Sequence, residues 1–394
     1  MRVSHLFLYK AVIKVIKNQL KDLWKDLFND ELEYIEWYFN NIYKEKNTKL
    51  NVEEDEVFGM LFENKYHLSV DSERFMGRYL VGVGVAPERR GEGIMKELLL
   101  QSIKEAYSCG EEFIYLTPID KNIYERFGFS YISALSKYEL DFLELKDFKK
   151  EFKIKKIKNE NYKENILIEL RDFYEDISQE YFVKMAREKE DYRKTLSELF
   201  CEKGLMYVSY DIFDKINGYM MLVKDENILV KEFLFKDKDT LEGLMSILYG
   251  YKDYYKKVEI ILPENIYLED YLKSEKGLKK TIKNKVQVRI LNVDKILKRL
   301  SKKFKENEEL KIYIQDRYIE KNTGIYKISK DKVEKTEEEF DLSLNIKDLA
   351  TLVYGFRDYN SLKKIESFYL KNKDKEEILS NMFIRKVNYF NQDF

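Results

Sequence analysis

The sequence has little of the chemistry on which several common kinds of site depend. Its 394 residues include two cysteines, Cys109 and Cys201, which do not form a C-x-x-C pair. This argues against a disulfide framework and a structural zinc site, and it fits a reducing, cytoplasmic location. The two histidines, His5 and His67, are few for a multi-histidine metal site or a histidine-based hydrolase. We therefore expect no metal ion.

Long apolar runs and an excess of one charge are also absent. No window approaches the ~18 consecutive apolar residues of a membrane span. Lysines interrupt the apolar stretch over residues 1–20, where a signal peptide would lie. Lys plus Arg number 71 against 72 Asp plus Glu, so the formal net charge is -1. We therefore expect neither a membrane nor a nucleic acid as a partner.

What the sequence does contain is abundant core-forming material. Hydrophobic residues make up 44% and aromatic residues 15%, with 31 Tyr and 25 Phe. This composition is typical of a globular chain. At roughly 150 residues per domain, the length predicts two or three domains, each with its own core.

The first 145 residues mix helical and strand patterns. In chain order, the predicted elements are helices over 20–28 and 32–39, strands over 57–62 and 79–85, a helix after Gly93, a strand over 112–117, a short helix around Tyr124 and a strand over 129–141. This order predicts an α/β sheet built outward from one strand, loop and helix unit.

The middle of the chain looks like a weak internal repeat. A lysine-rich stretch over 146–163 marks the first boundary. Residues 218–223 then echo 59–62, and the strand over 258–263 ends in proline as the one over 113–118 does. We interpret this region as a second copy of the fold.

The second copy lacks the loop in which chemistry would be expected. No Arg-Gly-x-Gly sequence separates the apolar run over 230–235 from the helical pattern over 241–248. The predicted copy therefore has no ligand loop. A third segment begins near residue 286, with a predicted strand over 286–291 and a helix over 293–300.

The most informative segment runs from a predicted buried strand through a basic glycine turn into a helix, over residues 83–96. A helix N-terminus aims several backbone N–H groups at one point, where the helix dipole also favours an anion. Gly91 and Gly93 permit close approach of the backbone, and Arg89 and Arg90 offer charge-assisted bonds to phosphate oxygens. The segment predicts a diphosphate site, and an ordinary Arg-Gly turn is the alternative.

This segment resembles the R-x-x-G-x-G/A signature of the GNAT superfamily of acetyl-coenzyme A-dependent N-acetyltransferases. The match begins at Arg90 and departs at Met95, where the family has Gly or Ala. Tyr124, Gly128 and Phe129 resemble the family's Y-x-x-x-G-F segment near the cofactor sulfur. The resemblance implies acetyl-CoA as cosubstrate, bound by Val83, Gly84, Val85, Arg89, Arg90, Gly91, Glu92, Gly93, Ile94, Met95, Lys96, Ile119 and Asp120.

The whole chain resembles the enhanced intracellular survival (Eis) type of acetyltransferase. Those proteins join an active GNAT domain, a degenerate second GNAT domain and a sterol-carrier-like C-terminal domain. The expected fold is accordingly α/β and α+β, with domains over 1–145, 146–284 and 285–394. Residues 289–293 and 352–356, with the aromatic C-terminus, resemble the last domain.

The resemblance implies direct acetyl transfer from acetyl-CoA to an amine. An alkylamine with a pKa near ~10.4 is mostly protonated at neutral pH, so a base must accept its proton. The family assigns this role to the C-terminal carboxylate, here Phe394, and assigns protonation of the departing thiolate to Tyr124. A frayed tail and one more core tyrosine are the alternatives. A strand bulge around residues 83–85 is expected to free an oxyanion donor, and Cys109 is expected in the core.

We therefore expect a cytoplasmic N-acetyltransferase that acts on an amine of a small cationic molecule, aminoglycoside- or polyamine-like, or on a lysine. The family's oligomers imply a homo-oligomer, with a hexamer as one form. The alternative is a non-catalytic acyl-CoA or lipid-binding module. An extension beyond Phe394 separates the two, because it would displace the carboxylate and leave lipid binding unchanged.

Overall fold

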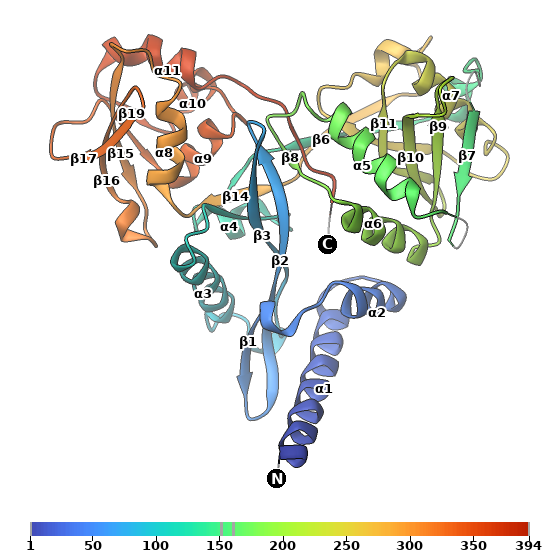
Figure 1. Cartoon of the computed structure of the whole chain (residues 1–394), viewed down its shortest axis with the longest axis horizontal. Helices are drawn as coiled ribbons and strands as arrows, with labels where there is room; N and C mark the ends of the chain where they lie inside the picture. The colour runs from blue at the N-terminus through green and yellow to red at the C-terminus, as the bar shows by residue number, and fades with distance from the viewer. Residues whose placement is uncertain (1, 150–152, 160–161, 393–394) are drawn as a thin grey trace.

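The computed structural model describes residues 2–149, 153–159 and 162–392, with the backbone alone for residues 2–13. The strands form three sheets that lie in different parts of the molecule (Figure 1). In that view the N-terminal part lies at the bottom, the middle of the chain at the upper right and the C-terminal part at the upper left.

The first sheet has the strand order β20-β8-β2-β3-β4-β14-β5, with β1 paired to β2. Its strands are β1 (Thr48–Glu53), β2 (Glu56–Val70), β3 (Glu73–Val85), β4 (Phe113–Leu116), β5 (Ser130–Tyr131), β8 (Val183–Met185), β14 (Gln287–Ile290) and β20 (Asn388–Tyr389). Its helices are α1 (Arg2–Leu27), α2 (Leu32–Asn41), α3 (Ile94–Ser108) and α4 (Lys121–Glu125).

The two faces of the first sheet are covered by different helices. Side chains on β4 alternate between the faces, as in any strand. Ile114 and Leu116 pack in the core beneath α3, whereas Phe113 and Tyr115 belong to the core that includes α1 and α2. The sheet is therefore buried on both sides around its central strands.

The second sheet has the order β13-β6-β12-β11-β10-β9-β7. Its strands are β6 (Ala134–Leu140), β7 (Lys153–Ile157), β9 (Leu205–Tyr210), β10 (Ile216–Lys224), β11 (Ile228–Phe235), β12 (Val258–Pro263) and β13 (Lys279–Asn284). α7 (Lys238–Tyr249) packs on one face, and α5 (Asn165–Ile177) and α6 (Lys189–Cys201) pack on the other. The succession β10, β11, α7, β12 repeats the succession β2, β3, α3, β4, as the sequence predicts.

The third sheet has the order β17-β16-β15-β18-β19. Its strands are β15 (Glu309–Gln315), β16 (Gly324–Ser329), β17 (Lys332–Thr336), β18 (Leu342–Asn345) and β19 (Tyr369–Leu370), and its helices are α8 (Val293–Ser301), α9 (Ile346–Val353), α10 (Tyr359–Lys364) and α11 (Glu376–Met382). One hydrophobic core runs from the first sheet into this part of the molecule.

Several strands cross between the predicted segments. The single strand expected over 129–141 is wrong, because the chain changes sheets at residues 132–133 and forms β5 in the first sheet and β6 in the second. Backbone bonds from Ile132 N to Val286 O and from Lys285 N to Ser133 O hold this crossing in place. The chain crosses back beside it, and β14 inserts between β4 and β5. The domain boundaries at 145 and 284 stay predictions.

The N-terminal helix is longer than the sequence pattern indicated. α1 begins at Arg2, well before the expected start at residue 20. Its lysines alternate with apolar residues, and no helix in the described part of the chain combines the length and the apolarity needed to cross a bilayer.

Candidate active site

A cavity of about 320 Å³ lies on the second sheet, but the predicted residues gather around a larger one on the first. β3 and β4 pair in parallel from Arg78 and Ile114 to Leu80 and Leu116, where β4 ends. β3 continues to Val85, so its last residues have no partner strand on that side. The cavity beside them measures about 790 Å³ and is lined by Leu27, Phe28, Val83, Gly84, Val85, Arg89, Arg90, Gly91, Gly93, Ile94, Met95, Lys96, Ile119, Ile123, Arg126, Phe127, Arg317 and Tyr318.

The N-terminus of α3 opens into this cavity. Gly91 and Gly93 adopt left-handed conformations, with φ of 89° and 92°, and Gly93 is the residue that precedes the helix. A Cβ atom at either glycine would meet no atom within 4 Å. The space in front of the helix is therefore open, and unpaired N–H groups at the helix start face it. These residues fit a diphosphate.

The two predicted arginines differ in what they contact. The Arg89 guanidinium bonds Glu53 at 2.9 Å and Glu92 at 2.8 Å, and its centre lies 4.5 Å from the Phe58 ring. Arg90 has one weak contact, from Nε to Val85 O at 3.5 Å. Of the two, Arg90 is the one whose charge is available to an anion in the cavity. Glu92 does not line the cavity and serves as a partner of Arg89.

A bulge interrupts β3 beside the cavity. Met60 on β2 pairs with Gly84 and Phe62 pairs with Val81, so Gly82 and Val83 stand opposite one residue of β2. Gly82 has a φ of 59°, which glycine adopts without strain. The bulge lies at the start of the predicted stretch over 83–85, and it turns backbone groups of β3 away from the β2 ladder.

A smaller cavity on the first sheet, of about 210 Å³, is lined in part by Tyr124. Its lining residues are Phe28, Tyr79, Leu80, Val81, Gly82, Val83, Leu116, Thr117, Ile119 and Tyr124. Tyr124 is buried in α4, and burial raises the pKa of its phenol to about 12. The phenol is therefore a neutral donor at physiological pH. Phe28, Val83 and Ile119 line both cavities, so the two cavities adjoin.

The C-terminal tail is anchored close to this site. Asn388 is fully buried, and its side chain accepts from Val183 N at 2.9 Å and donates to Ile132 O and Tyr354 O. The Phe390 ring lies 6.1 Å from that of Tyr115. The described part of the tail is thus packed, whereas Phe394 itself lies outside the described residues.

A short series of aromatic contacts, the aromatic path, connects the tail with the cavity that holds Tyr124. Tyr115 stacks on Tyr79 with ring centres 5.0 Å apart, and Tyr79 donates to Thr117 Oγ1 at 3.0 Å. Tyr79 and Thr117 both line the cavity that holds Tyr124. Phe390 therefore lies within two aromatic contacts of that cavity.

Two predictions near the cavity need to be refined or corrected. Ile119 is exposed and lines both cavities, but Asp120 instead caps α4 by accepting from Asn122 N at 2.7 Å. The expectation that Cys109 lies in the core is wrong. It follows the last turn of α3 at the surface, because the helix ends there and Gly110 turns the chain away.

Several lining residues were not foreseen. Leu27 and Phe28 continue the apolar pattern at the end of α1, which is a signal that the sequence does carry. Arg126 lies within the recognised segment at 123–129. Arg317 and Tyr318 come from a loop after β15, far away in the chain, and no local pattern marks them.

Comparisons with known proteins agree with this geometry. Residues 14–132 match the acetyltransferase (GNAT) domain family, and residues 293–391 match the sterol carrier protein domain family. No curated protein matches the chain in sequence.

Solved structures match over nearly the whole chain. A conserved protein of unknown function from Enterococcus faecalis V583, described as a probable N-acyltransferase, has 16% identity and a TM-score of 0.82, with 96% of this chain and 97% of that chain covered. A GCN5-related N-acetyltransferase from Anabaena variabilis has 18% identity, a TM-score of 0.79 and coverage of 96% and 97%. Eis1 from Mycobacterium abscessus has 15% identity, a TM-score of 0.71 and coverage of 92% and 96%.

Residues 14–132 therefore form a GNAT acetyltransferase domain, and the protein is an acyltransferase. More particularly, it joins a GNAT acetyltransferase domain to a C-terminal sterol carrier protein domain and shares its fold with Eis1. The predicted family and fold class are confirmed. GNAT domains use acetyl-CoA as cosubstrate.

Proposed function

We propose that this protein transfers an acetyl group from acetyl-CoA directly to an amine of a small cationic molecule or of a lysine. One observation carries the proposal. The cavity that begins at the open N-terminus of α3 adjoins the cavity that contains Tyr124. A cosubstrate held by its diphosphate at the helix would thus extend its thioester along β3 toward a phenolic acid.

The geometry supports an assignment of the residues that would hold acetyl-CoA. Backbone N–H groups at the start of α3 and the Arg90 side chain would bind the diphosphate. The unpaired edge of β3 after Leu80 offers backbone donors and acceptors to the extended arm of the cosubstrate. When bound, acetyl-CoA supplies an acetyl group activated as a thioester.

Tyr124 would provide the acid. A carbonyl under attack gains negative charge, and the backbone N–H groups around the bulge at Gly82 and Val83 would stabilise it. The leaving sulfur then needs a proton. Because its raised pKa keeps the Tyr124 phenol protonated, the phenol donates that proton and regains it from solvent.

The C-terminal carboxylate would provide the base. Phe394 follows Phe390 by four residues, which span at most roughly 13–14 Å when extended. Phe390 itself contacts the aromatic residues that lead toward Tyr124, so the proposed base follows a part of the tail that is anchored there. A carboxylate there attracts an ammonium group and accepts its proton. This is why we favour a cationic acceptor, as the resemblance to Eis-like enzymes also implies.

Release of free thiol from acetyl-CoA tests the proposal. Untagged protein is mixed with acetyl-CoA and a panel of polyamines, aminoglycosides and lysine peptides, beside Tyr124→Phe and a variant extended beyond Phe394. We expect turnover with at least one amine and a loss of turnover in both variants. Binding of acetyl-CoA without thiol release from any amine would instead favour a non-catalytic acyl-CoA-binding module.

A further inference from the structure

The cosubstrate cavity shares a wall with another cavity, of about 420 Å³, beside the C-terminal domain. The shared residues are Arg126, Phe127, Arg317 and Tyr318. The first two belong to the GNAT domain, and the last two belong to the loop between β15 and β16 of the sterol carrier domain. The wall is thus built jointly by two domains.

This wall is an aromatic stack with an arginine on each side. The rings of Phe127 and Tyr318 lie 5.5 Å apart at an angle of 27°. The Arg126 guanidinium lies 5.2 Å from the Phe127 ring, and that of Arg317 lies 5.6 Å from the Tyr318 ring. Both arginines are exposed, and neither forms an ion pair with a carboxylate in the described part of the chain.

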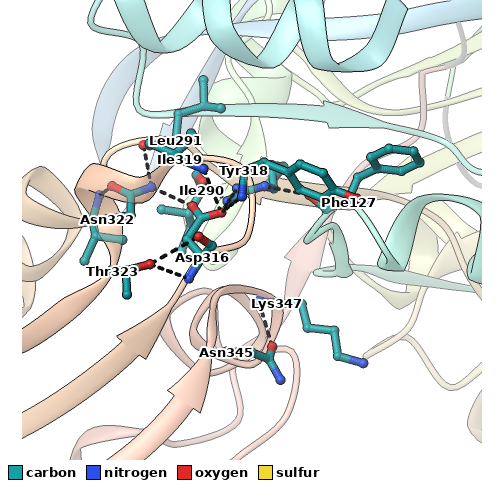
Figure 2. A network of polar contacts seen from close by, with 12 residues as sticks. Phe127, Ile290, Leu291, Asp316, Tyr318, Ile319, Asn322, Thr323, Asn345 and Lys347 are labelled. Atoms are coloured by element: carbon teal, nitrogen blue, oxygen red, sulfur yellow. Dashed lines mark hydrogen bonds and ion pairs between the residues drawn. The ribbon is translucent and has the colours of Figure 1, made fainter. Parts of the chain in front are cut away.

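The loop that carries Arg317 is fixed by a buried network (Figure 2). Asp316 and Arg289 form an ion pair at 2.6 Å, and both side chains are fully buried. Arg289 also donates from Nε to Phe127 O at 2.8 Å, next to the wall. Asp316 accepts from the backbone N–H groups of Tyr318 at 3.0 Å and Ile319 at 3.2 Å. The loop is therefore held from both sides of Arg317.

The same network explains why residue 128, in the Y-x-x-x-G-F segment, is a glycine. Gly128 has a φ of 88°, and a Cβ atom there would lie 2.7 Å from Arg289 Nε and 2.7 Å from Ile346 Cγ2. Asn322 extends the network by donating from Nδ2 to Asp316 Oδ2 at 2.8 Å. Because the recognised turn and the sterol carrier domain are packed together without room for a side chain, the position of Arg317 relative to the cosubstrate cavity is built into the fold.

We propose that Arg317, together with Arg126, binds the 3′-phosphate of the cosubstrate, so that the sterol carrier domain completes the acetyl-CoA site. This inference rests on the proposed function. With the thioester near Tyr124 and the diphosphate at α3, the nucleotide end must leave the large cavity on another side. Phosphate monoesters carry a charge of about -1.5 to -2 at neutral pH, and arginine pairs with phosphate in a bidentate manner.

The chemistry at the wall fits the nucleotide end of the cosubstrate, which carries the 3′-phosphate. Two arginines without carboxylate partners supply the charge, and both lie beside the 420 Å³ cavity into which a nucleoside could extend. Lys347 also lines this cavity, but it faces Glu125 at 3.6 Å and is partly neutralised. We therefore assign the phosphate to the arginines.

Calorimetric titration with CoA and with 3′-dephospho-CoA tests this inference, because the two ligands differ only in the 3′-phosphate. The variants are Arg317→Gln and Arg126→Gln, which keep an exposed polar side chain and remove its charge. Arg357→Gln is the matched control, because Arg357 is an exposed arginine of the same domain that lines neither cavity. Wild-type protein should bind CoA about tenfold or more tightly than 3′-dephospho-CoA.

We expect Arg317→Gln to weaken CoA binding, to leave 3′-dephospho-CoA binding unchanged and thereby to erase most of this preference, whereas Arg357→Gln retains it. A wild-type protein without preference, or an Arg317→Gln protein with the full preference, would overturn the inference. A wild-type protein that binds neither ligand would instead contradict the proposed function. Equal melting temperatures of the variants confirm that folding is intact.

Discussion

The first and second sheets contain the same strand, helix and strand unit, yet their helix N-termini differ. In the first sheet, residues 86–93 connect β3 to α3, and Gly93 leaves the start of the helix open. In the second sheet, β11 leads almost directly into α7, and the Asp237 carboxylate accepts from Thr240 N at 2.9 Å and Thr240 Oγ1 at 2.7 Å. The second copy fills its anion site with its own carboxylate.

The two copies also use their separated strands differently. β11 and β12 pair from Ile228 and Val258 to Val230 and Ile260, after which β11 has an irregularity opposite Met221. In the first sheet the corresponding space is a cavity. In the second sheet the C-terminal tail enters this space, where Asn391 Nδ2 donates to Lys231 O at 2.6 Å, and Asn391 and Gln392 line the remaining cavity of about 320 Å³. The comparison indicates that the tail occupies part of the space in the second copy that the first copy leaves open.

Of the predicted effects, the largest is the loss of kcat when the Tyr124 hydroxyl is removed from the first copy. Tyr124→Phe deletes the proposed acid from the first copy and keeps the ring in its core. General acid catalysis contributes about 10²–10⁴-fold, so kcat should fall within that range while the Kd of acetyl-CoA is unchanged. Steady-state kinetics and calorimetry measure the two quantities. An unchanged kcat would remove Tyr124 from the chemistry.

The pH dependence of the reaction rate tests the role of Tyr124 as well. The pKa of Tyr124 is raised to about 12, so its phenol stays protonated through pH 10, whereas an alkylamine acceptor loses its proton near a pKa of ~10.4. The wild-type rate should therefore rise up to pH 10 without a decline caused by Tyr124. A decline that begins near pH 9 and disappears in Tyr124→Phe would show that the phenol titrates earlier.

A carboxylate placed at the first helix should make the first copy resemble the second. Gly93→Asp adds a negative charge where the diphosphate would bind, and Gly93→Asn adds a side chain of nearly the same shape without charge. Both strain a residue with a φ of 92°. We expect the aspartate variant to bind acetyl-CoA at least about tenfold more weakly than the asparagine variant, which corresponds to about 1.4 kcal/mol. Equal affinities would place the diphosphate elsewhere.

A smaller effect on kcat is expected when a contact between the tail and the second copy is removed. Asn391→Ala removes the bond to Lys231 O, and a hydrogen bond contributes about 1 kcal/mol. We expect kcat to fall about fivefold with an unchanged Kd for acetyl-CoA, because the displaced tail carries the proposed base. Asn41→Ala is the control, since it loses a bond of 2.8 Å to Trp37 O within α2 and leaves the contacts of the tail intact. Equal effects of both variants would contradict a special role of the tail.

The smallest effect is expected from the cap of α7. Asp237→Ala should lower the free energy of unfolding by about 1 kcal/mol, as loss of an N-cap does, and leave acetyl-CoA binding unchanged. Thermal denaturation measures the first and calorimetry the second. Asp239→Ala, an exposed acid in the same helical turn, should change stability less. Weaker acetyl-CoA binding by Asp237→Ala alone would contradict the assignment of this carboxylate to a structural cap.

The local parts of the site could be predicted from the sequence because they are contiguous. The strand, the glycines at 91 and 93 and the helix that follows form one stretch of chain, and its physical chemistry is local. The segment around Tyr124 is equally compact. The cavity then arises because β4 ends at Leu116, which the proline at 118 already indicated.

The remaining features depend on contacts between distant segments. β14 pairs with β4 and β5 although its sequence resembles any buried strand, so its sheet could not be assigned. In the sequence, Arg317 looks like an ordinary surface arginine. Its position depends on the ion pair between Asp316 and Arg289, which fixes its loop in the folded chain. Likewise, the pairing of Arg89 with Glu53 depends on a hairpin that only the folded chain brings near.

The central claim is that one copy of the repeated unit binds the cosubstrate and the other does not. The most direct test is the stoichiometry of CoA binding by calorimetry, for wild-type protein, Gly93→Asp and Asp237→Ala. The account predicts one site per chain, weakened by Gly93→Asp and unaffected by Asp237→Ala. Two sites per chain, or binding that survives Gly93→Asp unchanged, would contradict it.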